Sequence, residues 1–189
     1  MKKLFLLLFA AAGMGVQAQM PASFPALLRA EQDSIITWRR WFHQHPELSN
    51  REVNTGAKIA ALLQSWGLEV QTGLAGHGVK AVLKGGKPGA VIAFRADIDG
   101  LPVTEPAGLP FASHETASYN GQTTGVMHAC GHDAHIAMLL GTAKILSKLR
   151  KDLPGTVVFI FQPAEEGPPP GETGGASQVV AKARWISRK

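Results

Sequence analysis

Side chains that could bind a metal ion or take part in catalysis are most concentrated in residues 127–135 of this 189-residue chain. These residues read Met-His-Ala-Cys-Gly-His-Asp-Ala-His. Three histidines, one thiol and one carboxylate fall within eight residues. Thiolate and imidazole are the ligands that borderline divalent ions such as zinc prefer. Cys130 and His132 lie two positions apart, so their side chains project the same way from an extended loop, and Gly131 leaves the backbone free to bend. The spacing predicts that Cys130 and His132 bind a metal ion.

The spacing gives weaker support for the other polar side chains of this segment as metal ligands. We expect His128 and His135 to pack or to support a ligand rather than to bind metal. Asp133 is equally well explained as the N-terminal cap of a helix that begins here. Further ligands must therefore come from elsewhere in the chain.

Two adjacent carboxylates, Glu165 and Glu166, follow an apolar stretch that ends at Phe161. Because Pro163 ends strand pairing, they stand at the exit of a strand, where open α/β sheets usually place their sites. Adjacent ionised carboxylates repel each other unless a cation compensates. We expect one glutamate to bind metal and the other to act as a base, and the alternative is a solvated acidic turn.

A second pair of carboxylates, Asp97 and Asp99, follows the apolar stretch 90–94. The two share one side while the chain stays extended. Either could orient a ligating imidazole, the usual arrangement around a protein-bound metal. Asx-turn hydrogen bonding is the competing explanation, above all for Asp99, which precedes Gly100.

The periodicity of apolar residues indicates which elements position these groups. Helices are predicted over 26–45, 52–66 and 133–149, and strands over 68–72, 79–83, 90–94 and 155–161. Residues 97–131 are irregular and rich in Gly, Pro and Ser, which is typical of a functional loop. Strands that alternate with helices predict an α/β layered domain.

The first residues have the pattern of an export signal. Lys2 and Lys3 precede an unbroken apolar run over residues 4–12, and small residues then predict cleavage after Ala18. The run is too short to span a bilayer and has no polar face that would favour an interfacial anchor. We expect a periplasmic or secreted protein without membrane contact after cleavage.

The composition excludes several classes of protein. The net charge of +5 falls to +3 when the two N-terminal lysines are removed, and the remaining basic residues are scattered without interleaved aromatics. This predicts no nucleic-acid partner. Cys130 is the only cysteine, so an internal disulfide is excluded. Gly86-Lys87 is followed by Pro88, which excludes a phosphate-binding loop.

Four segments together resemble the N-acyl-amino-acid amidohydrolases, hippurate hydrolases and auxin-conjugate hydrolases, a family of dinuclear-metal peptidases. In family order they are residues 43–49 (HQHPELS) with Glu52, 94–103 (FRADIDGLPV) with Glu105 and 108–111, 125–135 (GVMHACGHDAH), and 161–171 (FQPAEEGPPPG). His43 and His45 belong to the resemblance but receive no chemical role.

The resemblance implies a site for two divalent ions (zinc, manganese, nickel or cobalt) with the cysteine between them. It implies Cys130, His132 and Glu166 as ligands. Glu165 would be the general base, which takes a proton from the attacking water and passes it to the leaving amine. Asp97 matches an aspartate that orients a ligand. The implied substrate is a small N-acyl amino acid.

The resemblance also implies a domain organisation. Residues 19–176 would form the N-terminal part of the catalytic domain of a zinc-peptidase-like α/β/α sandwich, truncated before the smaller dimerisation domain, and residues 177–189 an atypical tail. Because the family's further histidine ligands lie outside this chain, we expect the isolated chain to bind metal weakly and to have little activity. A homodimer is expected only for the full-length form.

Two other functions remain open from the sequence. One is a binding or structural module in which Cys130 and His132 hold a single zinc, and metal stoichiometry separates this function from the dinuclear enzyme. The other is a thiol hydrolase with Cys130 as nucleophile. A thiol hydrolase would be inactivated by alkylation and would be indifferent to chelators.

Overall fold

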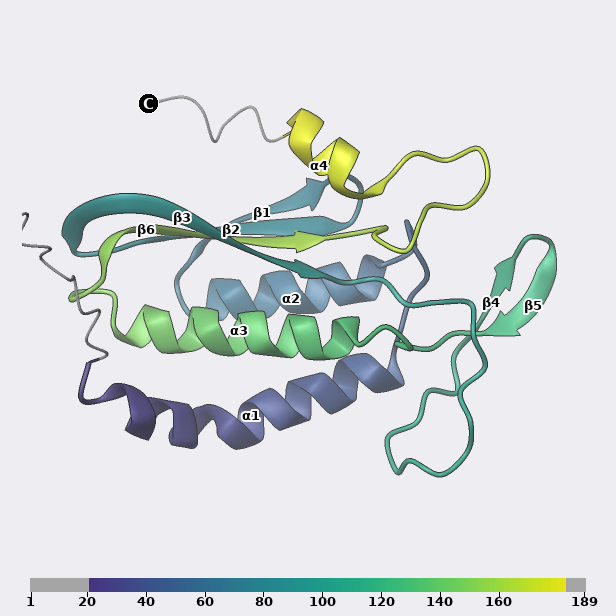
Figure 1. Ribbon diagram of the computed structural model, residues 1–189, viewed down its shortest axis with the longest axis horizontal. Coiled ribbons are helices and arrows are strands. Elements are labelled where there is room, and N and C mark those ends of the chain that lie inside the picture. The colour runs from purple at the N-terminus through teal and green to yellow at the C-terminus, as the bar shows by residue number, and fades with distance from the viewer. Residues whose placement is uncertain (1–20, 183–189) are drawn as a thin grey trace, which may run out of the picture.

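The computed structural model describes residues 21–182 (Figure 1). The elements in chain order are α1 (Phe24–Gln44), α2 (Val53–Ser65), β1 (Glu69–Leu74), β2 (Gly78–Lys84), β3 (Lys87–Asp97), β4 (Thr116–Tyr119), β5 (Gln122–Gly125), α3 (His132–Lys148), β6 (Pro154–Gln162) and α4 (Gly175–Lys182). The export signal expected over residues 1–18 lies outside the described residues. None of the helices within residues 21–182 is long and apolar enough to cross a bilayer.

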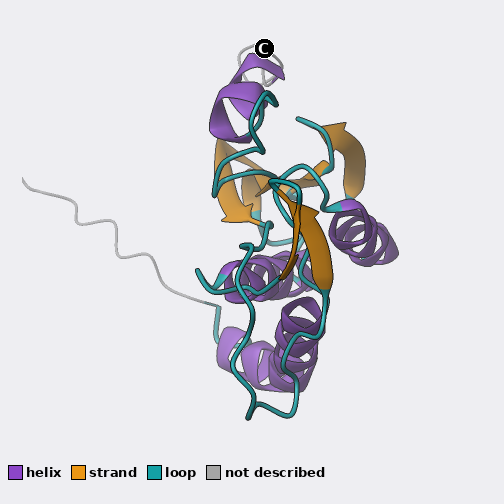
Figure 2. Ribbon diagram, turned by 90° about the vertical axis from the view of Figure 1, so that its right-hand side faces the viewer, coloured by secondary structure: helices purple, strands orange, loops and turns teal. Residues whose placement is uncertain are grey.

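The main sheet has four strands in the order β1-β2-β6-β3. β2 runs antiparallel to β1 and to β6, whereas β3 runs parallel to β6, with Asp97 beside Gln162 at their carboxyl ends. α1, α2 and α3 lie on one side of the sheet and α4 lies on the other (Figures 1 and 2). The α/β class expected from the sequence is confirmed.

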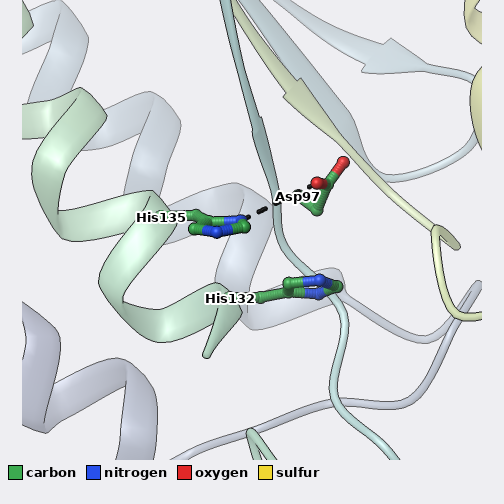
Figure 3. A group of neighbouring side chains, drawn as sticks. All are labelled: Asp97, His132 and His135. Atoms are coloured by element: carbon green, nitrogen blue, oxygen red, sulfur yellow. Dashed lines mark ion pairs between the residues drawn. The ribbon is translucent and has the colours of Figure 1, made fainter. Parts of the chain in front are cut away.

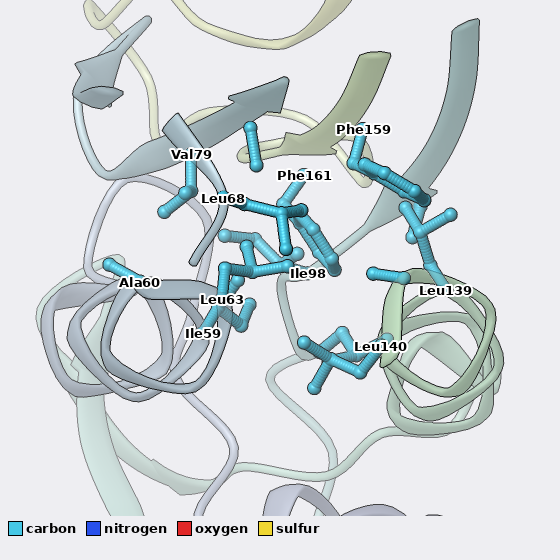
Figure 4. Packing of buried hydrophobic residues seen from close by; sticks show 14 of the residues in the cluster. Ile59, Ala60, Leu63, Leu68, Val79, Ile98, Leu139, Leu140, Phe159 and Phe161 are labelled. Atoms are coloured by element: carbon cyan, nitrogen blue, oxygen red, sulfur yellow. The ribbon is translucent and has the colours of Figure 1, made fainter. Parts of the chain in front are cut away.

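The core lies between the sheet and the helices α2 and α3 (Figure 4). Phe159 and Phe161 of β6 are fully buried, together with Ile59 and Leu63 of α2 and Leu140 of α3. Burial of each such side chain contributes about 1.5–3 kcal/mol relative to exposure. β6 is therefore the anchored central strand, and the residues that follow it are held by this packing.

Two elements differ from the expectation. The loop 97–131 contains the hairpin β4–β5, whose turn Asn120-Gly121 has positive φ angles of 50° and 77°. Neither of its four-residue strands has a buried residue, so they carry no apolar alternation that would reveal them. Residues 177–182, expected to begin an atypical tail, belong to α4. Val179 of α4 is buried in a second cluster against Val158 and Ile160 of β6.

Candidate metal centre

The candidate site forms where three separate segments meet at the carboxyl ends of β3 and β6. Asp97 ends β3 and Asp99 follows it, while the two glutamates follow β6 directly. The parallel pairing of β3 with β6 brings these segments to the same edge of the sheet. The third segment is the start of α3, which contributes His132 and, just before it, Cys130.

The structure brings together the three residues predicted as ligands. One atom from each of Cys130, His132 and Glu166 lies within 4.8 Å of the other two. Glu166 Oε1 is buried and has no hydrogen-bond partner among the residues described. Sulfur, imidazole nitrogen and carboxylate oxygen form a donor set that suits a borderline divalent ion, and such an ion would satisfy the orphaned oxygen. The residues therefore fit a metal ion.

The imidazole of His132 is held in the orientation that a ligand requires. Its Nδ1 donates a hydrogen bond to the backbone carbonyl of Asp99 at 2.9 Å. Its Nε2 faces Glu165 and Glu166, with carboxylate oxygens at 3.6 and 3.7 Å. Because the proton on Nδ1 is fixed by Asp99, the lone pair of Nε2 is free to bind an ion.

Without a metal ion, His132 instead favours a proton. Burial acts to lower the pKa of the ring, but the hydrogen bonds and the charge of Asp99 outweigh it and raise the pKa to about 9. A cation bound by the glutamates would occupy the same place as this proton. Metal and proton therefore compete for Nε2.

Asp99 joins the segments of the site. Its Oδ2 accepts hydrogen bonds from Ser49 Oγ at 2.7 Å and from the backbone N–H of Glu166 at 3.0 Å. Its Oδ1 lies 3.2 Å from Nδ1 of His132. Burial acts to raise the pKa of Asp99, but the hydrogen bonds from His132, Ser49 and Glu166 lower it overall. Asp99 thus contacts the imidazole of His132 directly. The orienting role that the resemblance implied for Asp97 stays a prediction.

Asp97 lies instead beside His135 (Figure 3). Its Oδ2 is 3.7 Å from His135 Nδ1 and 3.4 Å from an Arg95 nitrogen, and its Oδ1 is buried without a partner among the residues described. The rings of His132 and His135 stack at 5.3 Å. Asp97, His132 and His135 form a second group whose potential ligand atoms lie within 4.8 Å. His135, expected to pack or to support a ligand, thus stands next to the site.

Glu52 supports the site in a way that the sequence did not reveal. Its side chain is fully buried at the start of α2, and its Oε1 accepts the backbone N–H of Ala164 at 2.8 Å. Ala164 has a φ of 53°, so this bond holds a strained residue just before the two glutamates. Burial raises the pKa of Glu52 to about 7, only partly offset by backbone hydrogen bonds.

Asp133 does not cap α3, contrary to the alternative considered for it. The N-cap position is Gly131, with a φ of 85° and no side-chain cap. Asp133 is buried, and its Oδ2 accepts a hydrogen bond from His43 Nδ1 at 2.8 Å and forms an ion pair with Arg39 Nε at 2.8 Å. His43 also contacts Glu105 at 2.9 Å. This network fastens α1 and the loop after β3 to the first turn of α3, next to the ligands.

His128 is buried and lies outside both ligand groups. Neither ring nitrogen has a hydrogen-bond partner among the residues described. Burial lowers the pKa of His128 to about 4, so the ring is neutral at physiological pH. A neutral buried ring agrees with the packing role expected for it.

The surroundings of Cys130 disfavour a nucleophilic thiol. A hydrogen bond to Glu166, then burial, then the charges of Glu166, Glu165 and Asp97 all raise the pKa of the thiol. Nucleophilic cysteines need a lowered pKa, which nearby cations or a helix N-terminus supply. Carboxylates around a thiol suit a metal ligand, because a bound cation would reverse the effect of their charge.

An α/β sheet with sulfur, imidazole and carboxylate groups at its carboxyl edge defines the class of α/β metallohydrolases. Residues 93–188 match the model of peptidase family M20/M25/M40. The chain belongs to this family, as the resemblance of its motifs predicted, and its lineage is that of a hydrolase.

Individual relatives agree with this assignment. The chain is 47% identical over 146 residues to an N-acyl-L-amino acid amidohydrolase of Geobacillus stearothermophilus, covering 77% of this chain and 36% of the relative. It is 48% identical over 139 residues to an N-acetylcysteine deacetylase of Bacillus subtilis, covering 73% of this chain and 34% of the relative.

A solved structure extends the comparison to three dimensions. A dinuclear metal-binding M20 peptidase of Bacillus subtilis is 44% identical and superposes with a TM-score of 0.70, covering 82% of this chain and 40% of that chain. The chain thus spans about a third of the length of the curated relatives it matches. At the family level, these comparisons support metal-dependent hydrolysis of amide bonds.

Proposed function

We propose that this chain carries part of the active site of a metal-dependent hydrolase that cleaves the amide bond of small N-acyl amino acids. The observation that carries the proposal is the convergence of Cys130, His132 and Glu166 from two distant segments within 4.8 Å. The names of the amidohydrolase and the deacetylase among the relatives support the substrate class.

Each residue has a separate role in this proposal. Cys130, Nε2 of His132 and Glu166 would hold the ion, and Asp99 fixes the imidazole through its carbonyl oxygen. A bound divalent ion would polarise the amide carbonyl and lower the pKa of the attacking water. Glu165 would accept the proton of that water and deliver it to the leaving amine. Its partly exposed carboxylate, 3.6 Å from Nε2 of His132, borders the place where substrate would enter.

The proposal includes two ions of zinc, manganese, nickel or cobalt, and the thiolate of Cys130 would be one of the groups that hold them. The second group, Asp97 with His132 and His135, adds further donors next to His132. The chain alone supplies few ligands for two ions, so we expect weak metal binding and little activity from it in isolation. Export, homodimer formation by the full-length form, and the absence of nucleic-acid and membrane partners remain predictions.

Metal binding provides the direct test. The chain would be titrated with Co²⁺, and thiolate-to-cobalt absorption would be recorded. We expect this absorption to appear in the wild type and to vanish in Cys130→Ala, with affinity reduced roughly 10- to 100-fold or more in His132→Ala and Glu166→Gln. His114→Ala, which replaces an exposed histidine, is the matched control. Unchanged affinity in the His132 and Glu166 variants would refute the site.

Hydrolysis of N-acetyl and N-benzoyl amino acids tests the chemistry. Any activity should disappear with a chelator and return with Co²⁺ or Zn²⁺, and Glu165→Gln should abolish it without preventing Co²⁺ binding. Activity that survives chelation and is lost on alkylation would instead establish the thiol hydrolase. Stable binding of one zinc without any hydrolysis, even when the rest of the fold is supplied, would favour the single-zinc module.

A further inference from the structure

The segment that joins α1 to α2 contacts the start of the loop between β6 and α4, which carries the two glutamates (Figure 1). Ser49 donates a hydrogen bond to Asp99 at 2.7 Å, and the same carboxylate oxygen accepts the backbone N–H of Glu166. Further along the segment, Glu52 accepts the backbone N–H of Ala164. These contacts fix the beginning of the loop beside the metal centre.

The two residues between Ser49 and Glu52 hold the other end of the same loop. The side-chain amide of Asn50 donates to a carboxylate oxygen of Glu172 at 3.0 Å and to the carbonyl oxygen of Thr173 at 3.1 Å. Arg51 donates one hydrogen bond to each carboxylate oxygen of Glu172, at 3.0 and 2.5 Å. Such bidentate arginine–carboxylate pairs are stronger and more specific in geometry than single ion-pair contacts.

The two ends of the loop also pack against each other. A Cβ atom added at Gly174 would lie 2.7 Å from the Cβ of Ala164 and 3.0 Å from Oδ1 of Asn50, so only glycine fits there. A Cβ atom at Gly175 would lie 2.7 Å from the carbonyl oxygen of Ala164. Residues 164–174, which we call the glutamate loop, therefore form a closed Ω-type loop with Asn50 at its neck.

The middle of the glutamate loop has little backbone support of its own. Residues 168–170 are prolines, which have no N–H to donate. Gly167 and Gly171, on either side of them, have φ angles of 106° and 85°, which glycine adopts without strain. The position of the loop therefore depends on how its two ends are held.

We propose that Asn50, Arg51 and Glu172 are positioning residues: by closing the far end of the glutamate loop, they fix where Glu165 and Glu166 stand. They act only through the loop and touch neither metal nor substrate. The consequence for metal binding rests on the proposed function, whereas the closure itself rests on the contacts alone.

The alternative is a surface ion pair without effect on the site, because exposed pairs often contribute little to stability. The side chains of Arg51 and Glu172 are 54% and 36% exposed. Three features favour closure: the bidentate geometry, the additional bond from Asn50, and the packed neck. The hydrogen bonds from Arg51 and then from Asn50 also lower the pKa of Glu172 to about 2, so its carboxylate is ionised at physiological pH.

Hydrogen exchange of the metal-free 189-residue chain tests whether the loop is closed. We expect Arg51→Met and Glu172→Gln to speed exchange at the N–H groups of Ala164 and Glu166 roughly fivefold or more, because a loop released at its far end opens more often. The urea midpoint of global unfolding should stay unchanged, since the broken pair lies on the surface.

Cobalt titration tests whether closure matters to the metal centre. Because Glu166 lies in the loop, Arg51→Met should lower the affinity for Co²⁺ by roughly three- to tenfold, less than the loss of a direct partner of a ligand. Lys84→Met is the matched control. It breaks the exposed ion pair with Glu69 beside Thr156, at the opposite end of β6, and should change neither exchange nor affinity.

Further variants separate positioning from a general loss of structure. A chain with both Arg51→Glu and Glu172→Arg should bind Co²⁺ more tightly than either single variant, because the ion pair forms again in reverse. Arg51→Lys should lie between the wild type and Arg51→Met, since lysine keeps the charge without the bidentate geometry. Gly174→Ala should resemble Arg51→Met, because its methyl group opens the neck without changing a charge.

Exchange at Glu166 that stays at the wild-type rate in both Arg51→Met and Gly174→Ala would overturn the proposal. So would faster exchange with unchanged Co²⁺ affinity, or a double variant no better than the single ones. A wild-type chain that does not bind Co²⁺ would refute the proposed function, and the exchange rate at Glu166 would then decide this inference by itself.

Discussion

At the scale of single residues, the site depends on how Asp99 holds His132. The carbonyl oxygen of Asp99 fixes the Nδ1 proton, and its carboxylate also holds the loop of Glu166. Asp99→Asn removes the charge beside the imidazole, so we expect Co²⁺ affinity to fall by roughly 10- to 100-fold. A larger loss in Asp97→Asn than in Asp99→Asn, measured by the same titration, would support the orienting role that the resemblance implied for Asp97.

The raised pKa of His132 predicts a pH dependence of stability. Because its pKa of about 9 in the metal-free fold lies above its ordinary value of 6.5, the proton stabilises the fold fully below pH 6.5. This contribution is lost as the pH rises through 9, so the free energy of unfolding should fall by up to about 3 kcal/mol over that window. Denaturant titrations at several pH values would measure it.

His132→Gln is the control for this effect. In this variant the free energy of unfolding should no longer fall between pH 6.5 and 9. Any change of the free energy of unfolding with pH below 6.5 should remain. A wild-type stability that is flat over this window would contradict the protonated form of His132 in the metal-free fold.

At the scale of elements, Glu52 connects the start of α2 to the loop after β6. Its pKa of about 7, above the ordinary 4.5, means that the metal-free fold loses stability as the pH rises from 4.5 through 7. Glu52→Gln keeps an acceptor for the Ala164 N–H and should abolish this loss. Glu52→Ala leaves that buried N–H without a partner and should cost about 1–3 kcal/mol at every pH.

Thermal unfolding at pH 4.5 and pH 8 separates the two Glu52 variants. We expect Glu52→Gln to match or exceed the wild type at pH 8, and Glu52→Ala to unfold at lower temperature under both conditions. Equal destabilisation by both variants at pH 8 would show that the charge of Glu52, and not its hydrogen bond, supports the loop.

The sequence predicted the elements whose side chains follow a regular apolar period. The buried faces of α2, α3 and β6 were predicted in this way. The meeting of Cys130 and His132 with Glu166 was implied by the resemblance of the motifs and not by the apolar period. The bond from His132 to Asp99 could not be predicted, because it uses a backbone carbonyl 33 residues away. Glu52 belongs to the motifs that carry the resemblance, but its contact could not be predicted, since its partner is a backbone N–H 112 residues later in the chain.

The same reasoning explains the missed hairpin. The pair Asn120-Gly121 is a strong turn signal, because both residues tolerate positive φ. The flanking strands are short and have no buried residue, so no apolar alternation marked them as strands. A turn signal alone was too little to assign β4 and β5 within a loop rich in Gly and Pro.

At the scale of the whole molecule, β3 should make the isolated chain prone to self-association, because it is an edge strand of the described sheet and Val91, Ile92 and Phe94 on it are exposed. Long apolar edges are templates for pairing with other chains. In Ile92→Lys a charge on the outer edge opposes such pairing, so we expect the monomer to persist to a concentration roughly tenfold higher than for the wild type. Size-exclusion chromatography with light scattering would measure this, with Val180→Lys, at an exposed valine of α4, as the control.

The exposed thiol of Cys130 offers a second route to association, through a disulfide between chains. Measurements with and without a reductant separate the two routes, because a reductant dissolves the disulfide-linked species and leaves strand pairing intact. Association through β3 should persist in reductant and in Cys130→Ala, and should be relieved only by a charge on β3. If Cys130→Ala alone restored a monomer at high concentration, the chains would associate through the disulfide and not through the edge of β3.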